Sequence, residues 1–181
     1  VLLDIKLYLR DELESLVEST SKLFDLMMSQ SEKFKSALMP GYTHMQLAMP
    51  SSFGLWFGAY AESLVDDLLV LQSTFEVVNK NPLGSAAGFG SSFPIDRKMT
   101  TKLLGFSDLS YNVVYAQMGR GKVERMVASS MANLADTLSR MSMDVCLFLN
   151  QTGGLTGRTH IHTKHRSKLP YPIRQSTEEP K

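Results

Sequence analysis

Residues 39–50 read Met-Pro-Gly-Tyr-Thr-His-Met-Gln-Leu-Ala-Met-Pro, and they separate two long segments that have helical periodicity. Pro40-Gly41 is typical of a turn, because proline presets φ and glycine adopts conformations that other residues avoid. Pro50 keeps the residue before it out of the α region, so the second helix is predicted to begin after it. The segment is therefore predicted to be a loop between two rigid helices.

Three polar side chains lie within this predicted loop, those of Thr43, His44 and Gln46. A histidine titrates near neutral pH, so one held between rigid helices is suited to proton transfer. The alternative is a loop histidine that only bonds backbone groups. The neighbouring hydroxyl and amide leave these two interpretations of His44 balanced on the residues alone.

Long amphipathic helices are predicted on both sides of the loop and again near the end of the chain. Apolar residues recur at three-to-four-residue spacing over residues 2–37, 51–79 and 122–151. Ser51 or Ser52 can cap the second of these helices. A helix of this length cannot bury its apolar stripe alone and needs comparable helices beside it. The predicted fold class is therefore all-α, a long-helix bundle.

The segment between the second and third helices is predicted to be irregular over residues 80–109. Residues 81–92 form a glycine- and serine-rich loop of unusual length, which indicates function or mobility. The loop lacks the Gly-Lys-Ser/Thr ending of a Walker phosphate loop. A short helix is predicted from Ile95 to Leu104, opened by Pro94 and stopped by Gly105. In the second helix, Gly54 and Gly58 are small enough to let a neighbouring helix approach closely.

Charge is distributed unevenly along the chain. Of the 181 residues, 43% are hydrophobic and 20% charged, as in a soluble globular protein. Residues 1–152 carry 13 Lys/Arg and 16 Asp/Glu, whereas residues 153–181 carry 6 and 2. The body is therefore slightly acidic, which gives no electrostatic case for nucleic-acid binding. We predict a helical-bundle domain over 1–152 and a divergent, disordered basic tail over 153–181.

Neither a metal site nor a disulfide is predicted. His160, His162 and His165 lie in the tail, where no acidic or cysteine side chain completes a ligand set. Cys146 is the single cysteine, which fits a reducing compartment, and its apolar neighbours predict a small buried side chain. No signal segment and no apolar run of membrane-spanning length is recognised. We therefore expect a cytoplasmic protein without a membrane partner.

The segment Gly41–Gln46 closely resembles the Gly-Tyr-Thr-His-x-Gln signature of the argininosuccinate lyases, a family in the fumarase/aspartase superfamily. Related lyases of that superfamily usually carry another residue where this chain has Tyr42. Pro82-Leu83-Gly84-Ser85, followed by Phe93–Arg97, resembles a second signature of the same family in the same order. Two ordered signatures at the expected separation make the resemblance specific, and it covers residues 1–151.

The resemblance implies the central helical domain of a homotetrameric enzyme in which loops of three subunits build each active site. The family reaction is the reversible β-elimination of argininosuccinate to arginine and fumarate, with no metal or organic cofactor. By resemblance, His44 belongs to the acid–base machinery, Thr43 binds substrate, and Gln46 is a further substrate-binding group.

A third match of the same family is an asparagine followed by an arginine eight residues on, here Asn112 and Arg120. Both are implied to bind substrate. An arginine suits a dicarboxylate because its guanidinium makes charge-assisted, bidentate hydrogen bonds. The alternative for Arg120 is a surface side chain in the turn that enters the third helix.

Two family segments are not found in this sequence. The family's Ser-Arg-Asn-Asp segment would lie just before Val1, and its catalytic serine loop would follow the point where the tail diverges. The family also usually carries glutamine where this chain has Met49. We therefore expect little or no lyase activity from this chain alone, and self-association through bundle faces that it leaves exposed.

Three alternatives stay open at this point. The first is another lyase of the superfamily, of the adenylosuccinate or fumarase/aspartase type. The second is a non-catalytic structural relative of the crystallin kind. The third is a helical assembly module whose tight oligomerisation would not depend on His44.

Overall fold

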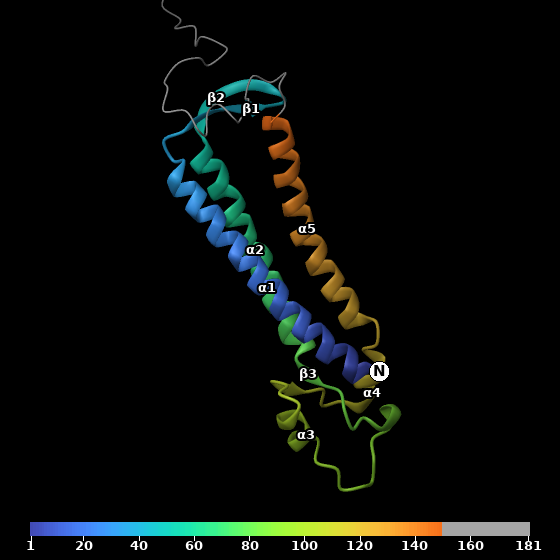
Figure 1. The fold of residues 1–181 in the computed structure, drawn as a ribbon. Helices are drawn as coiled ribbons and strands as arrows, with labels where there is room; N and C mark the ends of the chain where they lie inside the picture. The colour runs from blue at the N-terminus through green and yellow to red at the C-terminus, as the bar shows by residue number, and fades with distance from the viewer. Residues whose placement is uncertain (150–181) are drawn as a thin grey trace, which may run out of the picture. The chain divides into compact units, whose positions relative to one another are not determined.

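The structure is a computed structural model that describes residues 1–149, and long helices dominate it (Figure 1). The long helices are α1 (Leu2–Lys33), α2 (Phe53–Val78) and α5 (Lys122–Leu149). The shorter elements are β1 (Leu38–Thr43), β2 (Gln46–Ser52), β3 (Lys80–Asn81), η1 (Ala86–Gly88), α3 (Arg97–Leu103), β4 (Asp108–Leu109) and α4 (Val113–Met118). The predicted all-α class is confirmed. The predicted tail, 153–181, and its boundary at 152 lie outside the described residues.

The chain divides into two compact units, Val1–Thr137 and Leu138–Lys181. The first holds every element from α1 to Thr137 of α5, and the described part of the second is the end of α5. Cys146 lies in that end and is exposed, so the prediction of a buried cysteine is wrong. The buried positions of α5 recur from Val123 to Thr137 at three- and four-residue spacing, and Cys146 does not continue that series.

Helices α1 and α2 lie side by side over much of their length (Figure 1). The face of α2 toward the interior includes Leu64, Leu71 and Val78, each at most 1% exposed. Gly54 lies where the two helices meet, because a Cβ added there would lie 2.5 Å from the Cα of Lys35. The prediction that this glycine allows a close helix approach is confirmed.

Residues 38–52 form an antiparallel β-hairpin, so the prediction of an irregular loop is wrong. Pro40 and Pro50, which the sequence suggested would interrupt regular structure, are paired across the hairpin. A two-stranded ribbon has two edges, and edge strands tolerate proline. The register shifts between Pro40 and Tyr42, which places a bulge at Gly41.

The N-termini of α2 and α3 show which sequence signals predict the start of a helix correctly. Ser52 caps α2, and its Oγ accepts a hydrogen bond from the backbone N–H of Leu55 at 3.1 Å, as one of the two predicted caps. The short helix α3 begins at Arg97 and not at Ile95, because Asp96 is its cap and accepts from the N–H of Met99 at 2.9 Å. Side-chain capping therefore outweighs Pro94 as a start signal.

Beyond the end of α2, a buried asparagine organises the short elements. Asn81 in β3 is fully buried, and its Nδ2 donates to Oγ1 of Thr101 at 2.9 Å. Its Oδ1 accepts from the backbone N–H of Leu83 at 2.9 Å. The same strand pairs in parallel with β4. One side chain therefore links β3, α3 and the loop that follows β3.

We predict that Asn81→Ala lowers the free energy of unfolding by about 1–3 kcal/mol, because it leaves Oγ1 of Thr101 without this donor and the backbone N–H of Leu83 without its acceptor. Urea denaturation of the wild-type and variant chains measures the change. Asn79→Ala is the matched control, since Asn79 is only half buried and accepts from the N–H of Ser107 at 3.4 Å. Equal losses in the two variants would contradict a special role for Asn81.

Within the described residues, none of the helices combines the length and the apolar character that a membrane span needs.

Candidate functional site

The predicted loop residues lie at the tip of the β1–β2 hairpin. Thr43 pairs with Gln46 across the hairpin, and His44 and Met45 form the two-residue turn between them. Directly paired residues place their side chains on the same face of a ribbon. All four residues are exposed. The structure therefore brings Thr43, His44 and Gln46 together at one accessible tip.

The turn at this tip has an unusual residue choice. The φ values are 50° at His44 and 59° at Met45, so both residues are in the left-handed region. Two-residue hairpin turns with this backbone usually contain asparagine, aspartate or glycine. A non-glycine residue held there costs on the order of 1–3 kcal/mol and tends to occur where function requires it. The backbone thus favours a functional role for His44 over a purely structural one.

The imidazole of His44 has no hydrogen-bond or ion-pair partner among residues 1–149. The interpretation of His44 as a residue that only bonds backbone groups therefore finds no support in the described part of the chain. An exposed imidazole at the tip is free to meet a substrate or another chain.

The second predicted group, Asn112 and Arg120, lies around the short helix α4. Asn112 caps α4, and its Oδ1 accepts from the backbone N–H of Tyr115 at 2.9 Å. This capping bond engages the Asn112 oxygen and leaves its amide N–H groups for other partners. Arg120 follows α4 in the turn before α5, and its side chain is exposed. Both interpretations of Arg120, substrate contact and surface side chain, fit that position.

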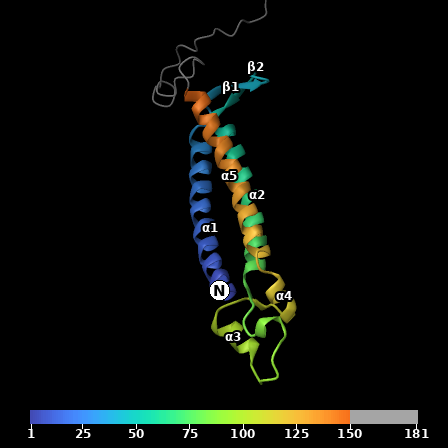
Figure 2. The same cartoon turned by 90° about the vertical axis from the view of Figure 1, so that its right-hand side faces the viewer.

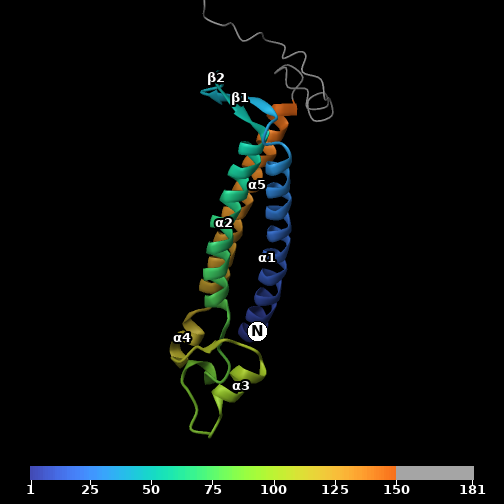
Figure 3. The same cartoon turned by 90° about the vertical axis from the view of Figure 1, so that its left-hand side faces the viewer.

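The two groups lie at opposite ends of the α1–α2 pair (Figure 2 and Figure 3). The hairpin precedes α2, whereas Asn112 and Arg120 follow it, and α2 has 26 residues. At 1.5 Å per residue this helix is about 39 Å long, so its two ends cannot belong to one small-molecule site. Within one chain the predicted residues form two clusters and not one.

Arg97 holds the backbone beside the second cluster, a role that the sequence alone did not indicate. Its Nε donates to the carbonyl of Leu83 at 2.8 Å, and its Nη2 donates to the carbonyl of Ser110 at 2.9 Å. It therefore joins the glycine-rich loop to the segment that leads into Asn112. A second link is the bond from Nε2 of Gln117 to Oγ of Ser85, at 2.8 Å.

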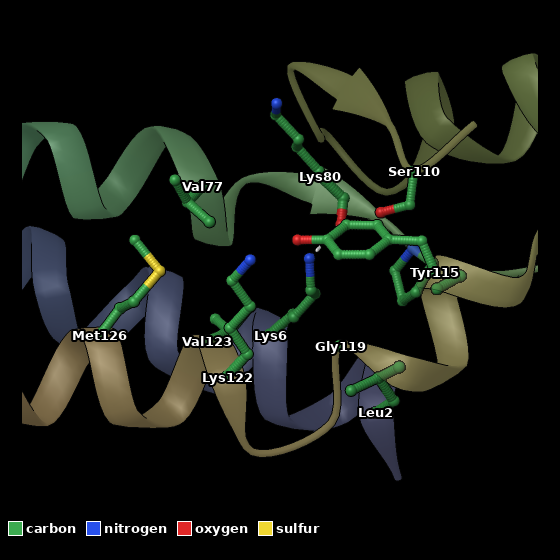
Figure 4. Close-up of a pocket in the computed structure, with 12 residues that line it drawn as sticks. Leu2, Lys6, Val77, Lys80, Ser110, Tyr115, Gly119, Lys122, Val123 and Met126 are labelled. Carbon is green, nitrogen blue, oxygen red and sulfur yellow. Dashed lines mark hydrogen bonds between the residues drawn. The ribbon is translucent and has the colours of Figure 1, made fainter. Parts of the chain in front are cut away.

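A cavity of about 220 Å³ lies at this same end of α2, and no sequence pattern indicates it (Figure 4). Lys6 of α1 lines it and is only 6% exposed. Burial is the main cause that lowers the pKa of Lys6, and the charge of Lys80 adds to this effect, whereas the carboxylate of Glu124 opposes it. Lys6 lies off the apolar stripe of α1, where helical periodicity indicates an exposed side chain.

No group of three or more His, Cys, Asp or Glu side chains that could hold a metal ion occurs within residues 1–149. The tail histidines His160, His162 and His165 lie outside the described residues.

Comparison with known proteins identifies the family to which this sequence is similar. A protein family described as lyase matches residues 1–166. The argininosuccinate lyases of Parabacteroides distasonis and Bacteroides fragilis are each 58% identical to this chain over 94% of its length and 38% of theirs. That of Stenotrophomonas maltophilia is 32% identical over 94% of this chain and 39% of its own. The chain thus spans about two-fifths of the length of these curated relatives.

Solved structures agree on the fold. An EDDS lyase in complex with formate is 26% identical, with a TM-score of 0.77 over 79% of this chain and 29% of its own. A fumarate lyase:delta crystallin from Brucella melitensis, bound to cobalt, is 19% identical, with a TM-score of 0.73 over 82% of this chain and 34% of its own. The second likeness concerns the fold alone.

Proposed function

This chain belongs to the lyase family, and from that premise we propose that it is the central segment of an argininosuccinate lyase, which eliminates arginine from argininosuccinate and releases fumarate. The observation that carries the proposal is the hairpin tip, where His44 lies between the paired Thr43 and Gln46 on a left-handed turn. This tip coincides with the segment that resembles the argininosuccinate lyase signature.

The reaction requires three catalytic functions from the protein. A base removes a weakly acidic proton next to a carboxylate, hydrogen-bond donors stabilise the resulting aci-carboxylate, and an acid protonates the departing guanidine nitrogen. We assign a proton-transfer role to His44, because an imidazole both accepts and donates protons near neutral pH. Thr43 and Gln46 supply hydrogen bonds to the substrate from the same face of the hairpin.

Asn112 and Arg120 bind substrate in this proposal, but at a site whose hairpin comes from another copy of the chain. The length of α2 supports this arrangement, since it keeps the two clusters of one chain apart. Arg120 offers its guanidinium to a substrate carboxylate, and the free amide N–H groups of Asn112 offer neutral donors.

A homotetramer is the assembly we propose, with the long helices packed between copies. Large apolar side chains are exposed on α1 and α2, among them Leu26 at 50%, Leu55 at 69% and Leu69 at 57%. Exposed apolar faces on several helices of one chain favour association. We place the assembled enzyme in the cytoplasm, consistent with the single cysteine and the biosynthetic role that the relatives' name implies.

Another lyase of the superfamily is the competing proposal. The EDDS lyase shows that a protein 26% identical to this chain is named for a different substrate. Tyr42 and the Phe93–Arg97 run favour argininosuccinate over adenylosuccinate, because both belong to segments that resemble the argininosuccinate lyases. A direct comparison of substrates decides between them.

The test is a chimera in which residues 1–149 replace the matching segment of the Parabacteroides distasonis argininosuccinate lyase. We expect the chimera to release fumarate from argininosuccinate and not from adenylosuccinate, and the 181-residue chain alone to release little or none. Fumarate is followed by its ultraviolet absorbance, and light scattering records the oligomeric state. A tetrameric chimera that is silent on argininosuccinate would reject the proposal.

A further inference from the structure

The cavity of about 220 Å³ is enclosed by the beginning of α1, the end of α2, helix α4 and the beginning of α5 (Figure 4). The polar side-chain groups that line this space belong to Lys6, Lys122, Tyr115 and Ser110. Lys80 also lines it, but through its backbone, and Figure 4 shows the Lys80 amino group directed away. Two ammonium groups and two hydroxyls therefore line a small space.

The two ammonium groups have spare hydrogen-bond donors. Lys6 uses one of its three donors, on the carbonyl oxygen of Lys80 at 2.9 Å. The Lys122 ammonium lies over the ring of Tyr115, 5.5 Å from its centroid. Among the residues that the structure describes, neither lysine forms an ion pair with a carboxylate. A buried ammonium without an opposite charge is costly, so the pocket is arranged for an incoming acceptor.

The negative groups near the pocket do not cancel this charge. Glu124 is the carboxylate that acts on Lys6, and its Oε2 is buried without a hydrogen-bond partner. Glu124 does not line the cavity. The lining therefore carries the ammonium groups of Lys6 and Lys122 and no carboxylate.

We propose that this pocket binds a small oxyanion, a carboxylate or phosphate, through the ammonium groups of Lys6 and Lys122 and the hydroxyl of Tyr115. Each of these groups donates hydrogen bonds to oxygen, and the cavity has room for a ligand of a few heavy atoms beside them. The pocket lies at the opposite end of α2 from His44, so within one chain it is separate from the hairpin tip. The inference does not depend on the lyase proposal, because binding is measured without turnover.

The experiment is calorimetric titration of the 181-residue chain with inorganic phosphate and, separately, with fumarate. We expect at least one of the two to bind, and Lys122→Met to weaken it about tenfold or more. Lys122 is the deciding variant, because it is exposed and its removal leaves the buried contact of Lys6 intact. The tighter of the two anions identifies whether the natural ligand is a phosphate or a carboxylate.

A matched control sharpens the result. Lys98→Met removes an exposed charge on α3 outside the pocket and should bind as the wild type does. The proposal is overturned if neither anion binds, or if Lys122→Met and Lys98→Met bind alike.

Discussion

Replacing His44 with alanine is expected to slow fumarate release by the chimeric enzyme about 10²–10⁴-fold, the usual contribution of a positioned general acid or base. The effect should fall on kcat more than on KM, because proton transfer is a property of the transition state and not of substrate binding. Steady-state rates with argininosuccinate, at matched tetramer concentration, measure both constants.

The backbone at His44 requires a control, since its φ of 50° is one that alanine adopts poorly. Asparagine is favoured in the left-handed region, so His44→Asn keeps the turn and removes only the imidazole. If proton transfer is the role of His44, both variants lose activity to a similar extent. Activity restored in His44→Asn would show that the histidine supports the hairpin and not the chemistry.

The adjacent turn residue gives the reverse comparison. Met45 has a φ of 59° and a side chain that is 85% exposed. Met45→Gly relieves the strain of a left-handed side chain and removes no polar group. The rate of fumarate release by the chimera should stay near that of the wild type. This result would show that activity depends on the imidazole of His44 and not on a side chain in the left-handed turn.

The long helices could be predicted from the sequence because their apolar spacing continues over many turns, and periodicity of that length overrides local ambiguity. The hairpin could not be predicted from the sequence, because proline and glycine are as common in loops as at the edges and bulges of a short β-ribbon. Pro40, Gly41 and Pro50 therefore do not distinguish the two structures. The comparisons confirm the resemblance to the argininosuccinate lyases. That resemblance rests on motifs that lie at both ends of α2.

The sequence proposes candidate site residues but does not show how they are arranged in space. Thr43, His44 and Gln46 are neighbours in sequence, so their proximity was assured, and the structure adds the exposed turn. Asn112 and Arg120 lie about the length of α2 away from the hairpin tip. This separation depends on the path of the chain along α2, which no local sequence pattern indicates. The burial of Lys6 likewise arises from segments far apart in sequence, and a helical stripe cannot show it.

Gly54→Ala is expected to lower the free energy of unfolding by about 1–3 kcal/mol or more, although alanine is the better helix former by about 1 kcal/mol. The added Cβ would lie 2.5 Å from the Cα of Lys35 and 2.6 Å from the carbonyl oxygen of Ser31. Both are backbone atoms, so no side-chain rotation relieves the overlap and the two helices must separate. Urea denaturation of the 181-residue chain measures the loss.

Gly58→Ala is the matched control on the same face of α2. Its added Cβ would meet only Oγ of Ser31, at 3.3 Å, and a shift of a few tenths of an ångström relieves this contact while the hydroxyl keeps its hydrogen bond to the carbonyl of Gly54. Helix propensity then dominates, and the free energy of unfolding should stay the same or rise. Equal destabilisation by the two variants would show that the close approach at Gly54 is not what holds α1 against α2.

Gly54 also bears on the hairpin, because it lies where the hairpin leaves the helix pair. The N–H of Gly54 donates to the carbonyl of Phe34 at 3.2 Å, and the N–H of Phe53 donates to the carbonyl of Ala37 at 2.9 Å. Separation of the helices at this point would break both bonds and displace the base of β1 and β2. In the chimera, Gly54→Ala should therefore reduce the rate as well as the stability, whereas Gly58→Ala should reduce neither, because these two bonds hold the base of the hairpin that carries His44.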